Sequence, residues 1–237
     1  LEKFKENNSA SLAGCEVTIF EAIDGRSMNF PTLEASGFST DKHWRDPLLK
    51  RTLTWGEIGC FLSHYKAWEL IAEQNEPVMV LEDDAILTGT IAEIDQMIDG
   101  HDILYLAHAE QRAEGRRTLD DNLVRPCYPY WTSAYVITPD GAAKLLDTDV
   151  AKAIIPVDEY MPRMTDRVDV VAAIPPLATP VSRAELGTDV EPTKETDYVV
   201  DFETHVVTCG DNPEKMGMLQ ESSGDMGILI TNVLKNE

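Results

Sequence analysis

The sequence predicts an α/β domain with a mostly parallel sheet. Short apolar runs that suit buried strands alternate with segments whose apolar residues recur at helical spacing. This alternation is typical of chains in which helices cover a parallel sheet. The chain has 237 residues, of which 43% are hydrophobic, and this is enough to bury the core of one large domain.

The first half of the chain begins with a helix and a strand. Residues 1–13 look helical, and residues 16–22 alternate imperfectly in hydrophobicity, which indicates a strand. Thr54 and Glu57 form a capping box at the start of a long helix, because each side chain can bond the backbone of the other. Apolar residues at helical spacing extend this helix to about residue 74.

The second half continues the alternation. Thr138 can cap a helix whose first residue is Pro139, and Pro156 opens another helix that runs to about Met164. Residues 109–122 are polar and indicate a loop. The remaining predictions are strands over residues 78–81, 102–107, 133–138 and 168–174, and a helix over residues 90–98.

The end of the chain differs from the rest. Strand-like residues 205–209 and 228–234 flank a helix-like segment at residues 212–222, which predicts one βαβ unit. The first residues have the composition of a helix interior, so we expect the chain to be a piece of a longer protein. The predicted parts are a main domain over residues 1–181, an acidic linker over 182–202 and the start of a possible second α/β domain over 203–237.

Charge limits the partners that the chain can bind. It carries 42 acidic and 20 basic residues, a formal net charge of −22. Such a field repels nucleic acid and anionic membranes, and no apolar run reaches the roughly 18 residues of a membrane span. The four cysteines lie far apart, which favours buried free thiols over a zinc site. Few cysteines and no leader in the sequence favour a cytoplasmic location, with the endoplasmic reticulum lumen as the alternative for a eukaryotic protein.

An apolar run ends abruptly in three carboxylates. Residues 78–81 suit a buried strand, and Glu82, Asp83 and Asp84 follow at its carboxyl end, where ligands bind in open α/β sheets. Because three anions repel one another, we expect a cation there, and Mg²⁺ or Mn²⁺ that bridges a nucleotide diphosphate fits best. The alternative is a solvated acidic turn.

Other polar clusters have both a functional and a structural interpretation. Asp158 or Glu159 could act as a general base, although the first turn of a helix favours acids in any protein. Glu57 and His64 share a helix face and could bind a sugar or phosphate, or pair in helix packing. Residues 128–131 (YPYW) could stack on a sugar or pack in the core, and Arg112, Arg116 and Arg117 could meet phosphates or be solvated.

Two segments together resemble a known family. Residues 55–64 (WGEIGCFLSH), followed by residues 80–84 (VLEDD), resemble the signature of glycosyltransferase family 25, which includes lipooligosaccharide and procollagen galactosyltransferases. The resemblance covers residues 1–181, and the first strand of the family is missing from this sequence. Further similar segments are residues 20–25 (FEAIDG), 133–137 (SAYVI), 141–146 (GAAKLL) and 156–161 (PVDEYM).

The resemblance implies a GT-A-like, Rossmann-like fold. It also implies inverting transfer of a hexose, commonly galactose, from a UDP-sugar to a hydroxyl group of a glycan or of a protein hydroxylysine, often with Mn²⁺ (or Mg²⁺). The metal ligands would be Asp83 and Asp84, and the base Asp158 or Glu159. The implied donor-binding residues are Glu57, Ser63, His64, Glu82, Asp83 and Tyr135.

Two alternatives come from other functional classes. The chain could be a non-catalytic module that keeps a transferase fold and binds a sugar or a cation without turnover. It could also be an acidic Ca²⁺-binding interaction domain, but the sequence has no DxDxDG loop, which counts against this interpretation. The absence of GxGxxG, Walker and GxSxG motifs weakens dehydrogenase, nucleoside triphosphatase and hydrolase interpretations.

Overall fold

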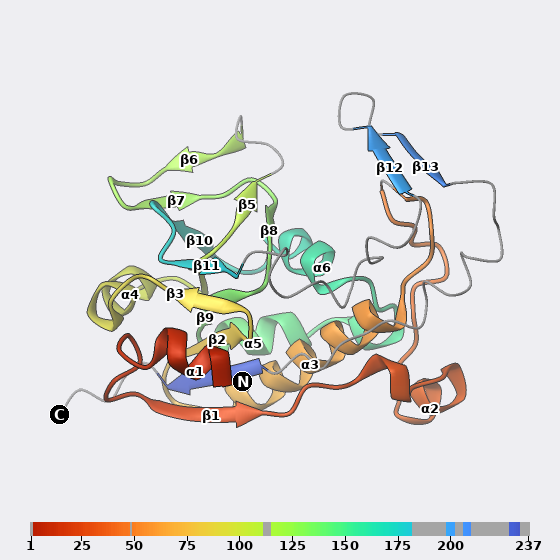
Figure 1. The fold of residues 1–237 in the computed structure, drawn as a ribbon, viewed down its shortest axis with the longest axis horizontal. Coiled ribbons are helices and arrows are strands. Elements are labelled where there is room, and N and C mark those ends of the chain that lie inside the picture. The colour runs from red at the N-terminus through yellow and green to blue at the C-terminus, as the bar shows by residue number, and fades with distance from the viewer. Residues whose placement is uncertain are drawn as a thin grey trace.

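A central sheet of eight strands organises the molecule (Figure 1). The computed structural model describes residues 2–47, 49–110, 115–181, 198–201, 206–209 and 228–232. In spatial order the strands are β1 (Glu16–Phe20), β14 (Ile228–Asn232), β2 (Val78–Glu82), β9 (Ala134–Ile137), β4 (Ile103–Tyr105), β10 (Val170–Ala173), β7 (Leu123–Arg125) and β6 (Arg117–Thr118).

The α/β class is confirmed, but the prediction of a mostly parallel sheet is wrong. Only β4 and β10 pair in parallel, and the other neighbours in the central sheet are antiparallel. The cause is β9, which lies between β2 and β4 and runs antiparallel to both. The connection from β4 to β9 has no helix among its described residues, so it does not form the βαβ crossover that parallel neighbours need.

The helices predicted within the described residues are present, but the one predicted over residues 1–13 already ends at Asn8. The long helix α3 begins at the predicted capping box, in which Thr54 Oγ1 accepts from the Glu57 N–H at 3.1 Å and Glu57 Oε2 accepts from the Thr54 N–H at 2.7 Å. The helices are α1 (Glu2–Asn8), α2 (Phe30–Ala35), α3 (Trp55–Ala72), α4 (Ile91–Ile98), α5 (Pro139–Leu146) and α6 (Val157–Arg163), with 3₁₀ turns η1 (Gly25–Ser27) and η3 (Asp149–Lys152).

Three small two-stranded sheets lie outside the central one. They pair β11 (Ala178–Pro180) with β3 (Ala85–Leu87), β5 (Ala109–Glu110) with β8 (Pro129–Tyr130), and β12 (Tyr198–Asp201) with β13 (Val206–Cys209). The segment over residues 109–122 was predicted as a loop, and the structure places the short strands β5 and β6 within it.

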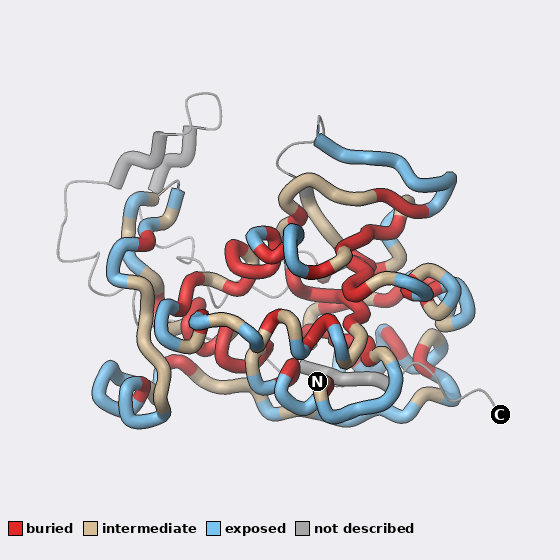
Figure 2. The backbone as a smooth tube through the Cα atoms, turned by 180° about the vertical axis from the view of Figure 1, so that it is seen from behind, coloured by how far each residue is buried: buried red, intermediate tan, exposed pale blue. Residues whose placement is uncertain are grey.

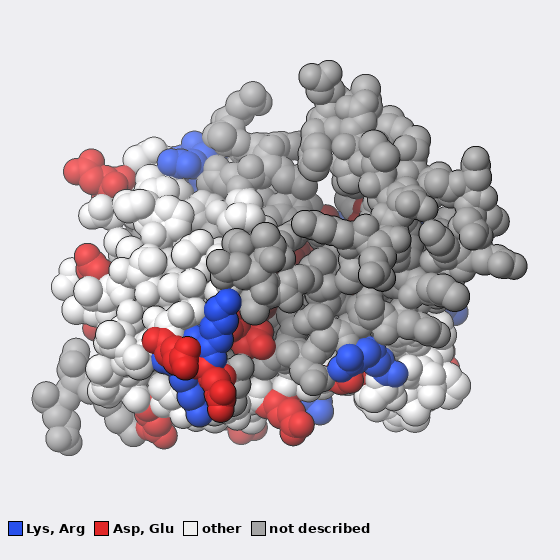
Figure 3. Space-filling model, viewed as in Figure 1, with Lys and Arg blue, Asp and Glu red and all other residues white. Residues whose placement is uncertain are grey.

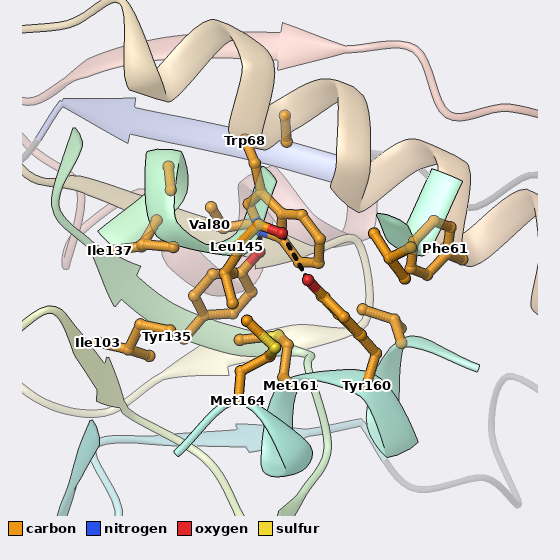
Figure 4. Packing of buried hydrophobic residues seen from close by; sticks show 14 of the residues in the cluster. Phe61, Trp68, Val80, Ile103, Tyr135, Ile137, Leu145, Tyr160, Met161 and Met164 are labelled. Carbon is orange, nitrogen blue, oxygen red and sulfur yellow. Dashed lines mark hydrogen bonds between the residues drawn. The ribbon is translucent and has the colours of Figure 1, made fainter. Parts of the chain in front are cut away.

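The sheet separates two apolar layers. Figure 2 shows the buried segments gathered in the middle of the molecule, with exposed segments on the outside. Helices α3, α5 and α6 pack on one face, and α1, α4 and the β3–β11 pair pack on the other. Figure 4 shows the first layer, in which Phe61 and Trp68 of α3 face Tyr160 of α6, and the Tyr160 hydroxyl donates to the Leu145 carbonyl. This aromatic layer fixes α3 and α6 relative to the sheet.

The C-terminal strand joins the central sheet. Residues 228–232 form β14, which pairs antiparallel with both β1 and β2. The predicted helix over residues 212–222 lies outside the described residues, and the division into a main domain, a linker and a second domain stays a prediction.

Charged side chains of both signs lie on the surface. On the face in Figure 3, basic side chains lie beside acidic ones over the lower part of the described surface. None of the helices in the described part is long and apolar enough to cross a membrane.

Candidate functional site

The acidic residues lie where the sequence predicts, at the carboxyl end of β2. Residues 78–81 are buried, Glu82 is 8% exposed, and Asp83 and Asp84 are partly exposed in the turn that leads to β3. The carbonyl of Asp84 accepts a hydrogen bond from the Val181 N–H at 2.7 Å, which holds this turn against the end of β11. A partly exposed pair of carboxylates therefore stands next to a buried one.

Glu82 points into the protein. Its Oε1 atom accepts from the Thr132 hydroxyl at 2.9 Å and lies 3.1 Å from His64 Nε2. Both partners are buried, His64 completely. Because an anion in the interior needs hydrogen-bond donors, these contacts explain how Glu82 is tolerated there.

The hydrogen bonds around His64 assign its tautomer. The Trp68 indole N–H donates to Tyr135 Oη at 3.0 Å, and Tyr135 Oη lies 2.9 Å from His64 Nδ1. Since Tyr135 Oη already accepts from Trp68, its own proton can go to His64 Nδ1, and His64 Nε2–H then donates to Glu82. A buried chain of hydrogen bonds thus runs in one direction from Trp68 to Glu82, with the rings of His64 and Tyr135 stacked at 5.7 Å.

Asp158 lies in the first turn of α6 and faces the same network. The residue is partly exposed, but its Oδ1 atom is buried and has no hydrogen-bond partner among the described residues. Burial, and then the negative charge of Glu82, raise the pKa of Asp158 to about 6. A carboxyl group that changes charge near neutral pH is suited to proton transfer.

Glu159 is buried, and both of its carboxylate oxygens accept hydrogen bonds. Its two oxygens accept from the hydroxyls of Tyr128, at 2.6 Å, and Tyr130, at 2.5 Å, and Arg163 lies 3.3 Å from Glu159 Oε2. These contacts hold the carboxylate in place. The geometry therefore favours Asp158 over Glu159 as a base, and gives Glu159 the role of fixing the two tyrosines.

Glu57 lies at the start of α3 and has structural partners. Besides the capping box, its carboxylate forms a bidentate ion pair with Arg51, with N–O distances of 2.8 and 3.0 Å. These contacts use both of its oxygens, so the structure does not bring Glu57 into the network of Glu82 and Asp158.

Ser63 anchors the segment after β1 to α3. Its hydroxyl accepts from the Ile23 N–H and donates to the Gly59 carbonyl, both at 2.8 Å. A Cβ atom on Gly59 would lie 2.5 Å from the Ile23 carbonyl oxygen, so only glycine allows this close approach. Ser63 and Gly59 therefore position the backbone beside the helix start.

Two kinds of metal donor occur in this region. The ligand atoms of Cys60, His64 and Glu82 lie within 4.8 Å of one another, but both His64 nitrogens take part in the hydrogen bonds described above. Burial and nearby carboxylates raise the pKa of the Cys60 thiol well above its usual range, so it stays protonated at neutral pH. Asp83 and Asp84 are partly exposed residues, although the Asp84 Oδ1 atom itself is buried, and carboxylate oxygens are the donors that Mn²⁺ and Mg²⁺ prefer.

The aromatic segment over residues 128–131 borders the site. Tyr128 and Trp131 have backbone φ angles of 55° and 78°, in the left-handed region that is unfavourable for bulky residues. Trp131 is 41% exposed, which is inconsistent with core packing. Arg116 and Arg117 are exposed, and Arg112 lies outside the described residues.

Sequence reasoning did not find Thr132 or the role of the Trp68 indole. Thr132 lies two residues before β9, and the antiparallel pairing of β9 with β2 brings the start of β9 to the end of β2. The signal was a hydroxyl residue at the start of a predicted strand, which becomes informative only when the antiparallel pairing is known.

Comparisons with known proteins identify the family of the chain. The family described as "Glycosyltransferase family 25 (LPS biosynthesis protein)" matches residues 2–161, which include the acidic turn, the His64 network and Asp158. The chain belongs to glycosyltransferase family 25. The family resemblance found in the sequence is thereby confirmed.

Relatives in the family are much longer than this chain. A "Glycosyltransferase 25 family member" of Anopheles gambiae is 38% identical over 166 residues, which cover 65% of this chain and 28% of the relative. "Procollagen galactosyltransferase 2" of Homo sapiens is 37% identical over 64% of this chain and 26% of its own length. "Probable inactive glycosyltransferase 25 family member 3" of Bos taurus is 33% identical over 69% of this chain and 30% of its own length. The chain thus spans less than a third of each of these relatives.

Proposed function

We propose that this family 25 protein transfers a hexose, galactose in our preferred assignment, from a UDP-sugar to a hydroxyl group with inversion of the anomeric carbon. The acceptor is a hydroxyl of a glycan or of a protein. The observation that carries the proposal is the partly buried Asp158, whose pKa of about 6 and free Oδ1 atom suit a general base next to the end of β2. The name of the human relative supports galactose as the transferred sugar. The same proposal includes a GT-A-like arrangement of the donor site.

The reaction is a single displacement. Asp158 takes the proton of the acceptor hydroxyl while that oxygen attacks the anomeric carbon, and the bond from this carbon to the diphosphate breaks. The buried Glu82 and His64 keep their hydrogen bonds during this step and hold the wall of the site. Because attack comes from the face opposite the leaving group, the anomeric configuration inverts.

Asp83 and Asp84 are the residues that would hold Mn²⁺ or Mg²⁺, since both residues are partly exposed and their carboxylates offer hard oxygen donors. Such an ion supplies positive charge that stabilises the departing diphosphate. With a net charge of −22, the chain itself offers a poor environment for a phosphate-bearing donor, which is a further argument for a bound cation.

Release of UDP from a panel of UDP-sugars, with and without Mn²⁺, tests the proposal in the whole protein. We expect Asp158→Asn to lower turnover by about a hundredfold or more, because a positioned general base contributes at least this factor. Asp166→Asn is the matched control, since Asp166 is exposed just after α6. Full activity of Asp158→Asn would remove this residue from the role of base.

A second candidate is a non-catalytic module that binds a sugar nucleotide or a cation. It is favoured by the relative from Bos taurus, whose name calls it probably inactive. Binding of UDP in calorimetry, together with no turnover of any UDP-sugar in the panel, would support this candidate. Turnover of any donor excludes it.

A further inference from the structure

The short segment that leads from β8 into β9 joins two acidic elements of the candidate site. The Tyr130 hydroxyl donates to Glu159 in the first turn of α6, at 2.5 Å, and the Thr132 hydroxyl donates to Glu82 at the end of β2, at 2.9 Å. Trp131 lies between these two anchors in the sequence. Its backbone therefore lies where the segment crosses from α6 to β2.

Trp131 combines a strained backbone with an exposed side chain. Its φ angle is 78°, in the left-handed region that is unfavourable for a bulky residue. The residue is 41% exposed, and no aromatic contact of its indole occurs within the described part of the chain. Strain of this kind persists only where the surroundings enforce it, and the hydrogen bonds of Tyr130 and Thr132 hold the backbone on both sides. Neither core packing nor a relaxed turn explains a tryptophan at this position.

The proposed displacement indicates where the transferred hexose lies. The diphosphate leaves toward the carboxylates that directly follow Glu82, and the proposed base, Asp158, directly precedes Glu159. In an inverting step the attacking and leaving groups lie on opposite faces of the anomeric carbon, so the hexose lies between the end of β2 and the first turn of α6. The segment that contains Trp131 spans the same interval.

We propose that the exposed indole of Trp131 is the surface on which the hexose of the UDP-sugar stacks. The inference rests on the proposed function and adds a donor-binding residue to it. The C–H groups on one face of a hexose carry partial positive charge and the face of an indole carries partial negative charge, so the two faces attract each other. The sugar hydroxyls then stay at the edge of the contact, where polar groups and water can bond them. A hexose held on this surface presents its anomeric carbon to Asp158 in a fixed orientation.

Calorimetry of the whole protein with UDP and with UDP-galactose, at saturating Mn²⁺, tests this role, and it does not depend on turnover. UDP lacks the hexose, so it reports on the nucleotide site alone. We expect Trp131→Ala to weaken binding of UDP-galactose by about tenfold and to leave binding of UDP within about twofold, since only the stacking surface is lost. Trp131→Phe keeps an aromatic face and should bind UDP-galactose within about threefold of the wild type.

Two more variants separate the ring from the backbone and from general effects of substitution. Glycine adopts a φ angle of 78° without strain, so Trp131→Gly removes the indole and keeps the conformation of the chain, and it should show the same selective loss. Phe30→Ala is the control, because Phe30 is a 56% exposed aromatic residue of α2, which Figure 1 places away from β8. This variant should bind both ligands as the wild type does.

Three results overturn the inference and leave the proposed function in place. Unchanged binding of UDP-galactose in both Trp131→Ala and Trp131→Gly shows that the hexose does not contact the ring. Equal losses for UDP and UDP-galactose show that the ring supports the nucleotide site or the fold. A higher KM for the acceptor, with donor binding unchanged, places the acceptor on the ring instead. A wild-type protein that binds neither ligand overturns the proposed function, and the inference falls with it.

Discussion

Replacement of Tyr135 by phenylalanine probes the buried chain of hydrogen bonds most directly. The ring of Tyr135 is completely buried, and its hydroxyl joins Trp68 Nε1 at 3.0 Å to His64 Nδ1 at 2.9 Å. Phenylalanine fills nearly the same space, so the loss comes from the two polar atoms that keep no partner. Each buried, unsatisfied polar group costs about 1–3 kcal/mol, so we expect the free energy of unfolding to fall by about 2–6 kcal/mol.

Urea unfolding followed by circular dichroism measures this loss. Tyr65→Phe is the control, because Tyr65 lies on α3 within the same aromatic layer and no hydrogen bond of its hydroxyl occurs within the described part of the chain. The control should change the free energy of unfolding by less than about 0.5 kcal/mol. An equally small change in Tyr135→Phe would show that the His64 network is not held by this hydroxyl, and the assignment of the His64 tautomer would be wrong.

Three further predictions concern the site and its supports. The pKa of Asp158 is raised from 3.8 to about 6 in the folded protein, so ionisation of Asp158 destabilises the fold progressively as pH rises from about 4 to about 6. In thermal unfolding, Asp158→Asn should therefore be more stable than the wild type at about pH 7.5, by at most ~3 kcal/mol. At about pH 3.5 the two proteins should be equally stable. In the same pH range kcat/KM should rise with an apparent pKa of about 6, and a profile flat from pH 5 to pH 8 would contradict the base. Gly59→Ala should destabilise by about 1–3 kcal/mol in urea unfolding, against the usual gain for alanine in a helix, because its Cβ would lie 2.5 Å from the Ile23 carbonyl oxygen. Asp83→Asn should raise the Mn²⁺ concentration for half-maximal activity by about tenfold or more, and an unchanged Mn²⁺ dependence would remove Asp83 from the metal site.

Local signals in the sequence located the elements but not their pairing. The capping box at Thr54 and the Thr138-Pro139 pair predicted where α3 and α5 begin, because these signals act within one turn of a helix. The alternation of strands and helices predicted the α/β class. It did not predict that β9 inserts between β2 and β4, since strand order depends on contacts between distant residues.

The candidate site was predicted in part for the same reason. The acidic turn and Asp158 stand out because each follows an apolar run or a proline in the sequence. Thr132 could not be recognised, because it reaches Glu82 only through the antiparallel pairing of β9 with β2. For Glu57 and Glu159, the residue type was consistent with ligand binding or catalysis, but their contacts with Arg51 and with two tyrosines are visible only in three dimensions.

The path of hydrogen bonds from Trp68 has a consequence for genetics. Trp68 contributes no surface to solvent, yet its indole sets the orientation of Tyr135 and, through it, of the wall beside the proposed base. A screen for variants that fold normally but lack the proposed transferase activity would therefore recover changes deep in the interior as well as at the surface. A conservative change such as Trp68→Phe would then lower activity as a substitution in the site does, although the indole of Trp68 does not contact the sugar in the proposed reaction.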